Sequence, residues 1–198
     1  MLAERRGELM ETLLGLIVGV GLSAACGFRV FVPLLGMSIA ALSGYITLAS
    51  DFAWIGTRTA LLAFSVATIL EIATYYVPWV DNMMDALMTP AAVVAGTIVT
   101  ASMVGDISPF LKWSLAVIAG GGVSAIVQGG TVALRAGSSG TTGGLANPMV
   151  STIEMIGSIL VTILAIVLPI LCLFAVVWIC YKIIHKMATS TLIKRIFA

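Results

Sequence analysis

Long apolar segments constrain this chain more than any other feature of its sequence. Six of them follow one another with little polar sequence between them, and they cover residues 10–27, 30–49, 58–79, 87–105, 110–134 and 149–183. A helix needs about 20 apolar residues to cross a hydrocarbon core that is roughly 30 Å thick. The pattern therefore predicts an all-α, polytopic transmembrane bundle of about six spans, folded as a single domain over residues 1–185.

The composition excludes a soluble globule. Of the 198 residues, 60% are hydrophobic and only 10% are charged, which is too little charge to cover a water-exposed surface. The formal net charge of +1 gives no basic field, so we predict no nucleic-acid partner. The partner that this composition does predict is the lipid bilayer, and both a homo-oligomer and a larger membrane complex are compatible with it.

The first apolar segment resembles a signal peptide at first sight. Arg5 and Arg6 precede an apolar run that reaches Cys26, as they would in a secreted precursor. The sequence that follows, FRVFVPLLGMSIAALSGYITLA, is a second apolar segment, whereas a tether behind a cleavage site would be polar. We therefore predict that the first segment stays in the protein as a membrane helix.

The first two segments meet without a polar loop, at Gly27–Arg29. This predicts a broken or tightly turned first hairpin. Backbone groups freed at membrane depth must be satisfied by protein or by a water-lined cavity. Two interpretations of Arg29 remain open: it faces a polar cavity, paired with an acid or an anionic ligand, or it reaches the lipid headgroups and caps a tight turn.

The last segment is too long for one crossing, since 35 residues at about 1.5 Å each would extend roughly 52 Å. It is either one long helix or a helix that bends at Pro169.

The basic residues indicate the orientation in the membrane. With six spans, one side of the membrane receives most of them, namely Arg5, Arg6, Arg58, Lys112, Lys182, Lys186, Lys194 and Arg195. The positive-inside rule then places both termini in the cytoplasm. A hairpin at Pro169 would instead make seven crossings.

The C-terminal residues 186–198 mix basic and apolar side chains. This composition predicts an amphipathic tail at the cytoplasmic membrane surface, with a frayed chain end as the alternative.

No motif for catalysis or metal binding is visible. His185 stands alone, and Cys26, Cys172 and Cys180 all lie in apolar runs. Neither H-E-x-x-H nor G-x-S-x-G occurs. We therefore predict a protein that is not an enzyme, with no catalytic residue, no metal and no cofactor.

A sparse set of polar side chains in or near the bilayer remains as the candidate substrate-binding site. These residues are Arg29, Glu71, Asp81, Asp85, Arg135, Asn147 and Glu154. Glu71 lies about 20 Å along the segment that begins at Arg58, which places it in the outer half of the bilayer. Asp81 and Asp85 are one helical turn apart and would project to one side of a helix that starts after Pro78, although solvated loop acids explain them equally well.

The start of the last segment has its own structural explanation. Asn147 before Pro148 is a natural helix N-cap arrangement. Glu154 would lie near the same membrane face as Asp81, Asp85 and Arg135, so that an acid-rich polar vestibule closed by two arginines is expected there.

Three stretches resemble a known family. GFRVFVPLL (27–35), EIATYYVPWVDNMMDALMTP (71–90) and ANPMVSTIE (146–154) are similar to the signature stretches of the bacterial membrane family of domain of unknown function 4126 (DUF4126). The resemblance implies a bacterial inner membrane protein and points to Arg29, Glu71, Asp81, Asp85, Asn147 and Glu154 as residues to test. The chain departs from the pattern at Thr74, Tyr75, Tyr76, Thr89 and Met155, where charged residues are usual.

Two functions are compatible with these observations. The leading hypothesis is a small permease or carrier in which Arg29 and Glu71 line an intramembrane cavity for a small polar or anionic solute or a lipid headgroup. The alternative is a non-catalytic accessory or assembly subunit of a larger membrane complex, docked through the basic C-terminal tail and through small-residue faces such as Gly15–Ala25.

Overall fold

Residues 2–77, 80–105 and 107–196 of the chain are described by a computed structural model, and every regular element in them is a helix. The helices are α1 (Leu2–Phe28), α2 (Phe31–Leu42), α3 (Arg58–Tyr75), α4 (Val80–Met103), α5 (Pro109–Leu115), α6 (Gly122–Thr142), α7 (Asn147–Val167) and α8 (Pro169–Ile196). A 3₁₀ helix at Ser50–Gly56 precedes α3, and a π-helical segment at Ala116–Gly121 joins α5 to α6. The all-helical prediction is confirmed.

Six helical stretches in the described part of the chain are long and apolar enough to cross a membrane. They are Leu9–Phe28, Arg58–Tyr75, Met83–Met103, Pro109–Thr142, Asn147–Val167 and Pro169–Thr189. The number agrees with the prediction. Two of the spans differ from those predicted. The helix in the second predicted segment is too short to cross the membrane, and the last predicted segment contains two helices.

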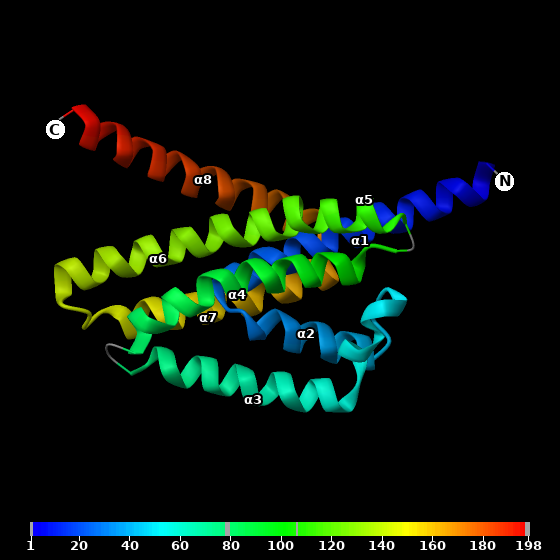
Figure 1. Ribbon diagram of the computed structural model, residues 1–198, viewed down its shortest axis with the longest axis horizontal. Helices are drawn as coiled ribbons and strands as arrows, with labels where there is room; N and C mark the ends of the chain where they lie inside the picture. The colour runs from blue at the N-terminus through cyan, green and yellow to red at the C-terminus, as the bar shows by residue number, and fades with distance from the viewer. Residues whose placement is uncertain (1, 78–79, 106, 197–198) are drawn as a thin grey trace.

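The prediction of a span over residues 30–49 is wrong. Helix α2 has 12 residues, about 18 Å at 1.5 Å per residue, and so falls short of the bilayer core. It ends at Leu42, with Ser43 as the C-cap, because Gly44, at φ 76°, takes the left-handed conformation that a glycine adopts easily. Figure 1 shows α1 ending part-way along the bundle, where α2 begins and runs back in the opposite direction.

The last predicted segment forms two helices, α7 and α8, which are separated at Pro169. Leu168 leaves the helical conformation with φ −135° and ψ 65°, and Pro169 has no N–H to continue the hydrogen-bond pattern. Helices α7 and α8 run in opposite directions, so α1 begins and α8 ends at opposite ends of the bundle (Figure 1). The arrangement differs from the six-crossing prediction, which put both chain ends on one side.

Three smaller boundaries also differ from the sequence interpretation. Helix α6 continues to Thr142, beyond the predicted segment end at residue 134, and Gly143 caps it with φ 63°. Asn147 is the first residue of α7, and Ala146 takes the N-cap position without a side-chain hydrogen bond, so the predicted Asn147 cap is wrong. Residues 186–196 of the predicted tail continue α8 as one helix, and their position at a membrane surface stays a prediction.

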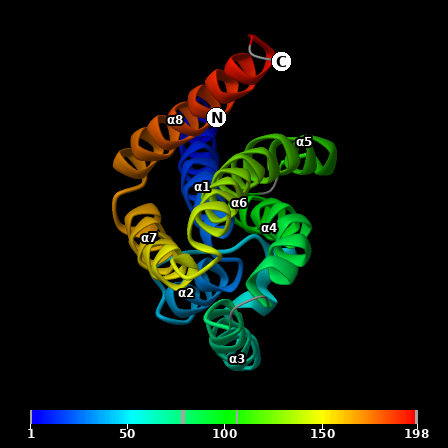
Figure 2. The same ribbon diagram turned by 90° about the vertical axis from the view of Figure 1, so that its left-hand side faces the viewer.

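Helix α1 forms the centre of the bundle, with α4, α6, α7 and α8 around it (Figure 2). Its glycines allow close approach: a Cβ on Gly19 would lie 2.9 Å from Thr100 in α4, and one on Gly21 would lie 2.8 Å from Ala165 in α7. Small residues permit such contacts between membrane helices. The small-residue face of α1 is therefore covered within the chain.

Candidate functional site

The break between α1 and α2 is closed by an acid from α3. The carboxylate of Glu71 accepts hydrogen bonds from the backbone N–H of Val30 at 2.8 Å and of Phe31 at 3.0 Å. These are among the N–H groups that the start of a helix leaves without a partner inside that helix. Inside a bilayer such groups must be satisfied by protein, and Glu71 satisfies two of them.

Arg29 lies at this break and turns its side chain into the protein. Only 1% of the residue is exposed. Its Nη2 donates to the backbone carbonyl of Ser151 at 3.1 Å and forms an ion pair with Oε2 of Glu154 at 3.4 Å. Both partners belong to α7, so Arg29 ties the helix break to that helix. Arg29 is a buried charge and does not reach the lipid headgroups.

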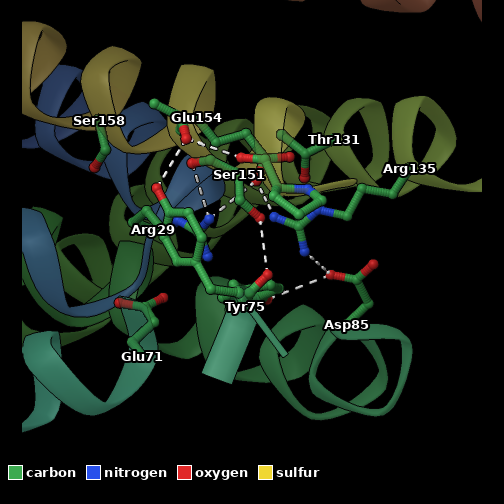
Figure 3. Close-up of polar contacts among 12 residues, drawn as sticks. Arg29, Glu71, Tyr75, Asp85, Thr131, Arg135, Ser151, Glu154 and Ser158 are labelled. Carbon is green, nitrogen blue, oxygen red and sulfur yellow. Dashed lines mark hydrogen bonds and ion pairs between the residues drawn. The ribbon is translucent and has the colours of Figure 1, made fainter. Parts of the chain in front are cut away.

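Arg135 of α6 is the second buried cation, with 2% of the residue exposed. Its Nη1 donates to Oδ1 of Asp85 in α4 at 2.5 Å, and its Nη2 donates to Oε2 of Glu154. Glu154 thus binds both arginines through one oxygen atom (Figure 3). The four side chains form one continuous charge network that joins α4, α6, α7 and the α1–α2 break.

Tyr75 of α3 provides the aromatic surface of this network. The guanidinium carbon of Arg29 lies 3.9 Å from the centre of its ring, and that of Arg135 lies 4.0 Å from the same centre. Cation–π attraction is strongest where water is excluded, and Tyr75 is 4% exposed. Its hydroxyl donates to Oδ1 of Asp85 at 3.3 Å. One ring therefore holds two like charges close together.

Several buried polar atoms of the network have no hydrogen-bond partner. They are Nε and Nη1 of Arg29, Nε of Arg135 and Oε1 of Glu154. A buried donor or acceptor left unsatisfied costs about 1–3 kcal/mol. Arg29 keeps two of its three nitrogen atoms in this condition. The site therefore has donors on its cations that a further ligand could use.

The predicted site residues fall into three groups. The network brings together four of them, Arg29, Asp85, Arg135 and Glu154. We name these four residues and Tyr75 the arginine cluster. Glu71 lies to one side of it (Figure 3) and binds backbone groups. Asn147 is buried at the start of α7, where its Nδ2 donates to the hydroxyl of Ser139 at 3.0 Å. The side chain of Asp81 lies outside the described residues.

The arginine cluster is closed, whereas the sequence had predicted a polar vestibule. Arg29, Arg135 and Glu154 are each at most 3% exposed. The part played by Tyr75 was missed in the sequence. The spacing could have indicated it. Tyr75 follows Glu71 by four positions, and residues four positions apart share one face of a helix.

The two guanidinium groups of the cluster are groups that can bind an anion. Guanidinium groups are planar donors that suit carboxylates, phosphates and similar anions. Within the described residues no group of three or more His, Cys, Asp and Glu could hold a metal ion. The cysteines of this part are free thiols, of which Cys26 and Cys172 are buried.

No curated protein and no solved structure matches the chain. The family described as domain of unknown function (DUF4126) matches it over residues 16–186, which includes α2 to α7 and every residue of the arginine cluster. The match therefore covers most of the bundle and all of the candidate site, and the chain, a multi-spanning membrane protein by its six apolar helices, belongs to the DUF4126 family.

Proposed function

We propose that this protein is a carrier, without catalytic activity, that moves a small anion across the bacterial inner membrane. The observation that supports the proposal most is the state of Arg29. It is a buried cation beside a helix break, and two of its nitrogen atoms have no partner. Charged residues inside membrane segments are expensive and usually mark the path of a substrate.

Arg29 and Arg135 are the binding residues in this proposal, and the acids are their partners when no substrate is present. Glu154 and Asp85 neutralise the two guanidinium groups, because an unpaired buried charge would be strongly destabilising. A substrate anion would take the free donors of Arg29 and replace part of the contact with Glu154. A small anion fits best, since the side chains of the cluster already contact one another.

The helix break supplies the mechanical element of the proposal. The start of α2 is held to α3 by Glu71. Arg29, just before α2, is held to α7 by its hydrogen bond to the carbonyl of Ser151. Broken helices at membrane depth are a recurrent way for carriers to place a binding site between two solutions. A shift of α2 with α3 against α7 would open the cluster from one side.

The small-residue faces give less support to an accessory subunit. A Cβ on Gly15 would clash with Met103 in α4, and one on Gly27 would lie 2.6 Å from Val127 in α6. These glycines pack inside the chain and leave that face without a surface for docking. A partner protein bound to the lipid-facing helices would instead support the accessory subunit.

The direct test is uptake of radiolabelled nitrate and chloride into liposomes that contain the purified protein. Uptake above that of protein-free liposomes is expected. Arg29→Gln should lower it about tenfold or more, since a hydrogen bond to a charged group contributes about 1.5–3 kcal/mol. Lys112→Gln is the matched control, because Lys112 is also a buried cation but pairs with Asp51 outside the cluster. Folded wild-type protein that moves neither anion would refute the proposal.

A further inference from the structure

The charges of the arginine cluster are balanced before any substrate binds. Arg29 and Arg135 contribute two positive charges, and Asp85 and Glu154 contribute two negative charges. Glu71 adds a further acid beside them, although its carboxylate is bound to two backbone N–H groups. A substrate anion would therefore leave the buried site with an excess of negative charge. In a region without water this excess is costly.

One acid of the cluster is placed to remove that excess. Glu154 is 3% exposed and uses only Oε2 for its two arginines, whereas Oε1 is buried without a hydrogen-bond partner. A proton on Oε1 would neutralise the carboxylate and displace no existing hydrogen bond. The ion pairs from Oε2 to both arginines would weaken at the same time, which frees their guanidinium groups for another anion.

The surroundings of Glu154 determine when this proton binds. Arg29 from the α1–α2 break and Arg135 from α6 face it directly. Tyr75 from α3 and Asp85 from α4 act on it through the two arginines. Among the described residues, α1, α2 and α8 also pack against α7 but give Glu154 no charged partner. Its protonation is therefore controlled by the two cations that the substrate anion also needs.

We propose that each monovalent anion moves together with one proton, and that Glu154 carries this proton. The proposal rests on the carrier function proposed above. Glu154 takes a proton from the solution on the side of entry, and Arg29 and Arg135 turn their donors from the carboxylate to the anion. On the other side the anion leaves, Glu154 releases the proton to that solution, and its ion pairs form again. One positive and one negative charge cross, so the cycle is electrically neutral.

The experiment measures nitrate uptake and internal pH in the same liposomes, with a pH-sensitive dye enclosed. Nitrate is the probe because its acid is fully dissociated and brings no proton by itself. We expect the interior to acidify by about one proton for each nitrate, and an inwardly directed proton gradient to accelerate uptake. A potassium diffusion potential should leave the rate unchanged. Uptake that follows this potential and causes no acidification would overturn proton coupling and leave the carrier function standing.

Variants separate the proton step from anion binding. Glu154→Gln keeps a neutral side chain of the same size, so it should still exchange internal for external nitrate but lose acidification and the response to a proton gradient. Glu71→Gln is the matched control in a neighbouring acid, and it should keep the ratio of one proton to one nitrate. Acidification that persists in folded Glu154→Gln would refute the role of Glu154.

A second substitution protects the test against a folding failure. If Glu154→Gln does not give folded protein, Glu154→Asp keeps the charge and shortens the side chain by one carbon. Coupled uptake should then remain at a lower rate, with a changed dependence on external pH. An unchanged pH profile in Glu154→Asp would refute the proposal as well. Wild-type protein that takes up no nitrate and no chloride would overturn both the carrier function and the coupling.

Discussion

The carboxylate of Glu71 accepts a hydrogen bond from the backbone N–H of Val30 at 2.8 Å, across 41 positions of the chain. The same carboxylate accepts the N–H of Phe31, so α3 closes the helix break between α1 and α2. An acid at the start of a helix also has a favourable interaction with the helix dipole. The break at Arg29 is thus stable because a residue from a different helix supplies its cap.

Replacing Glu71 should destabilise the fold more than it disturbs anion contacts. Glu71→Ala leaves one buried and one partly buried N–H group without a partner and should lower the free energy of unfolding by about 1–3 kcal/mol for each. Glu71→Gln keeps one acceptor oxygen and should lie between this variant and the wild type. The measurement is the thermal unfolding midpoint of each protein in the same detergent.

Ser65→Ala is the control for this prediction. Ser65 also lies in α3, but its hydroxyl donates to the carbonyl of Leu61 in the same helix, so its loss should leave the midpoint almost unchanged. A Glu71→Ala protein as stable as Ser65→Ala would contradict the capping role.

Tyr75 should matter through its ring more than through its hydroxyl. Tyr75→Leu removes the surface that both guanidinium groups contact at about 4 Å, and a desolvated cation–π contact is worth about 2 kcal/mol. Tyr75→Phe loses only the 3.3 Å hydrogen bond to Asp85. We expect a large decrease of the unfolding midpoint for Tyr75→Leu and a small one for Tyr75→Phe.

Tyr76→Phe tests the neighbouring position. The Tyr76 hydroxyl also forms a hydrogen bond with a residue of α7, Thr152, at 2.8 Å, but Tyr76 is exposed. It should unfold like the wild type. If Tyr75→Phe were as unstable as Tyr75→Leu, the hydroxyl and not the ring would hold the cluster.

Two glycines that are two positions apart should change stability in opposite directions when each is replaced by alanine. A Cβ on Gly120 would lie 2.5 Å from the backbone carbonyl oxygen of Gly96 in α4, whereas one on Gly122 would meet nothing within 4 Å. Overpacking costs about 1–3 kcal/mol, and alanine otherwise stabilises a helix by roughly 0.5–1 kcal/mol relative to glycine. Gly120→Ala should therefore lower the unfolding midpoint and Gly122→Ala should raise it. Equal shifts in both variants would mean that the π-helical segment does not pack as described.

The helices were predictable because membrane spans are read from length and hydropathy alone. Their exact limits were not, since they depend on single residues in particular conformations. Gly44 ends α2 early through its positive φ, and Leu168 breaks the last segment just before Pro169. Sequence indicated a bend at Pro169 but gave no means to choose between a tilted helix and a turn.

The candidate site was predictable as a set of residues but not as a network. Buried charges are rare in a bilayer, so Arg29, Asp85, Arg135 and Glu154 could be singled out from sequence. Which acid pairs with which arginine depends on how α4, α6 and α7 meet. Glu71 was grouped with Arg29 for the same reason, yet its contacts are to backbone N–H groups, which no sequence pattern records.

The direction of α8 leads to the last prediction. Helix α8 ends away from the end of the bundle where α1, α3 and α5 begin (Figure 1), so the basic residues of its last part, Lys182 and Lys186, lie away from Arg58 and Lys112. The positive charges are then divided between the two sides, and their distribution no longer fixes the orientation. Reporter proteins that are active on only one side of a membrane, fused in turn to each chain end, should therefore give opposite results. The same result at both ends would show that α8 does not cross the bilayer as a separate span, and the six-crossing arrangement with both ends in the cytoplasm would take its place.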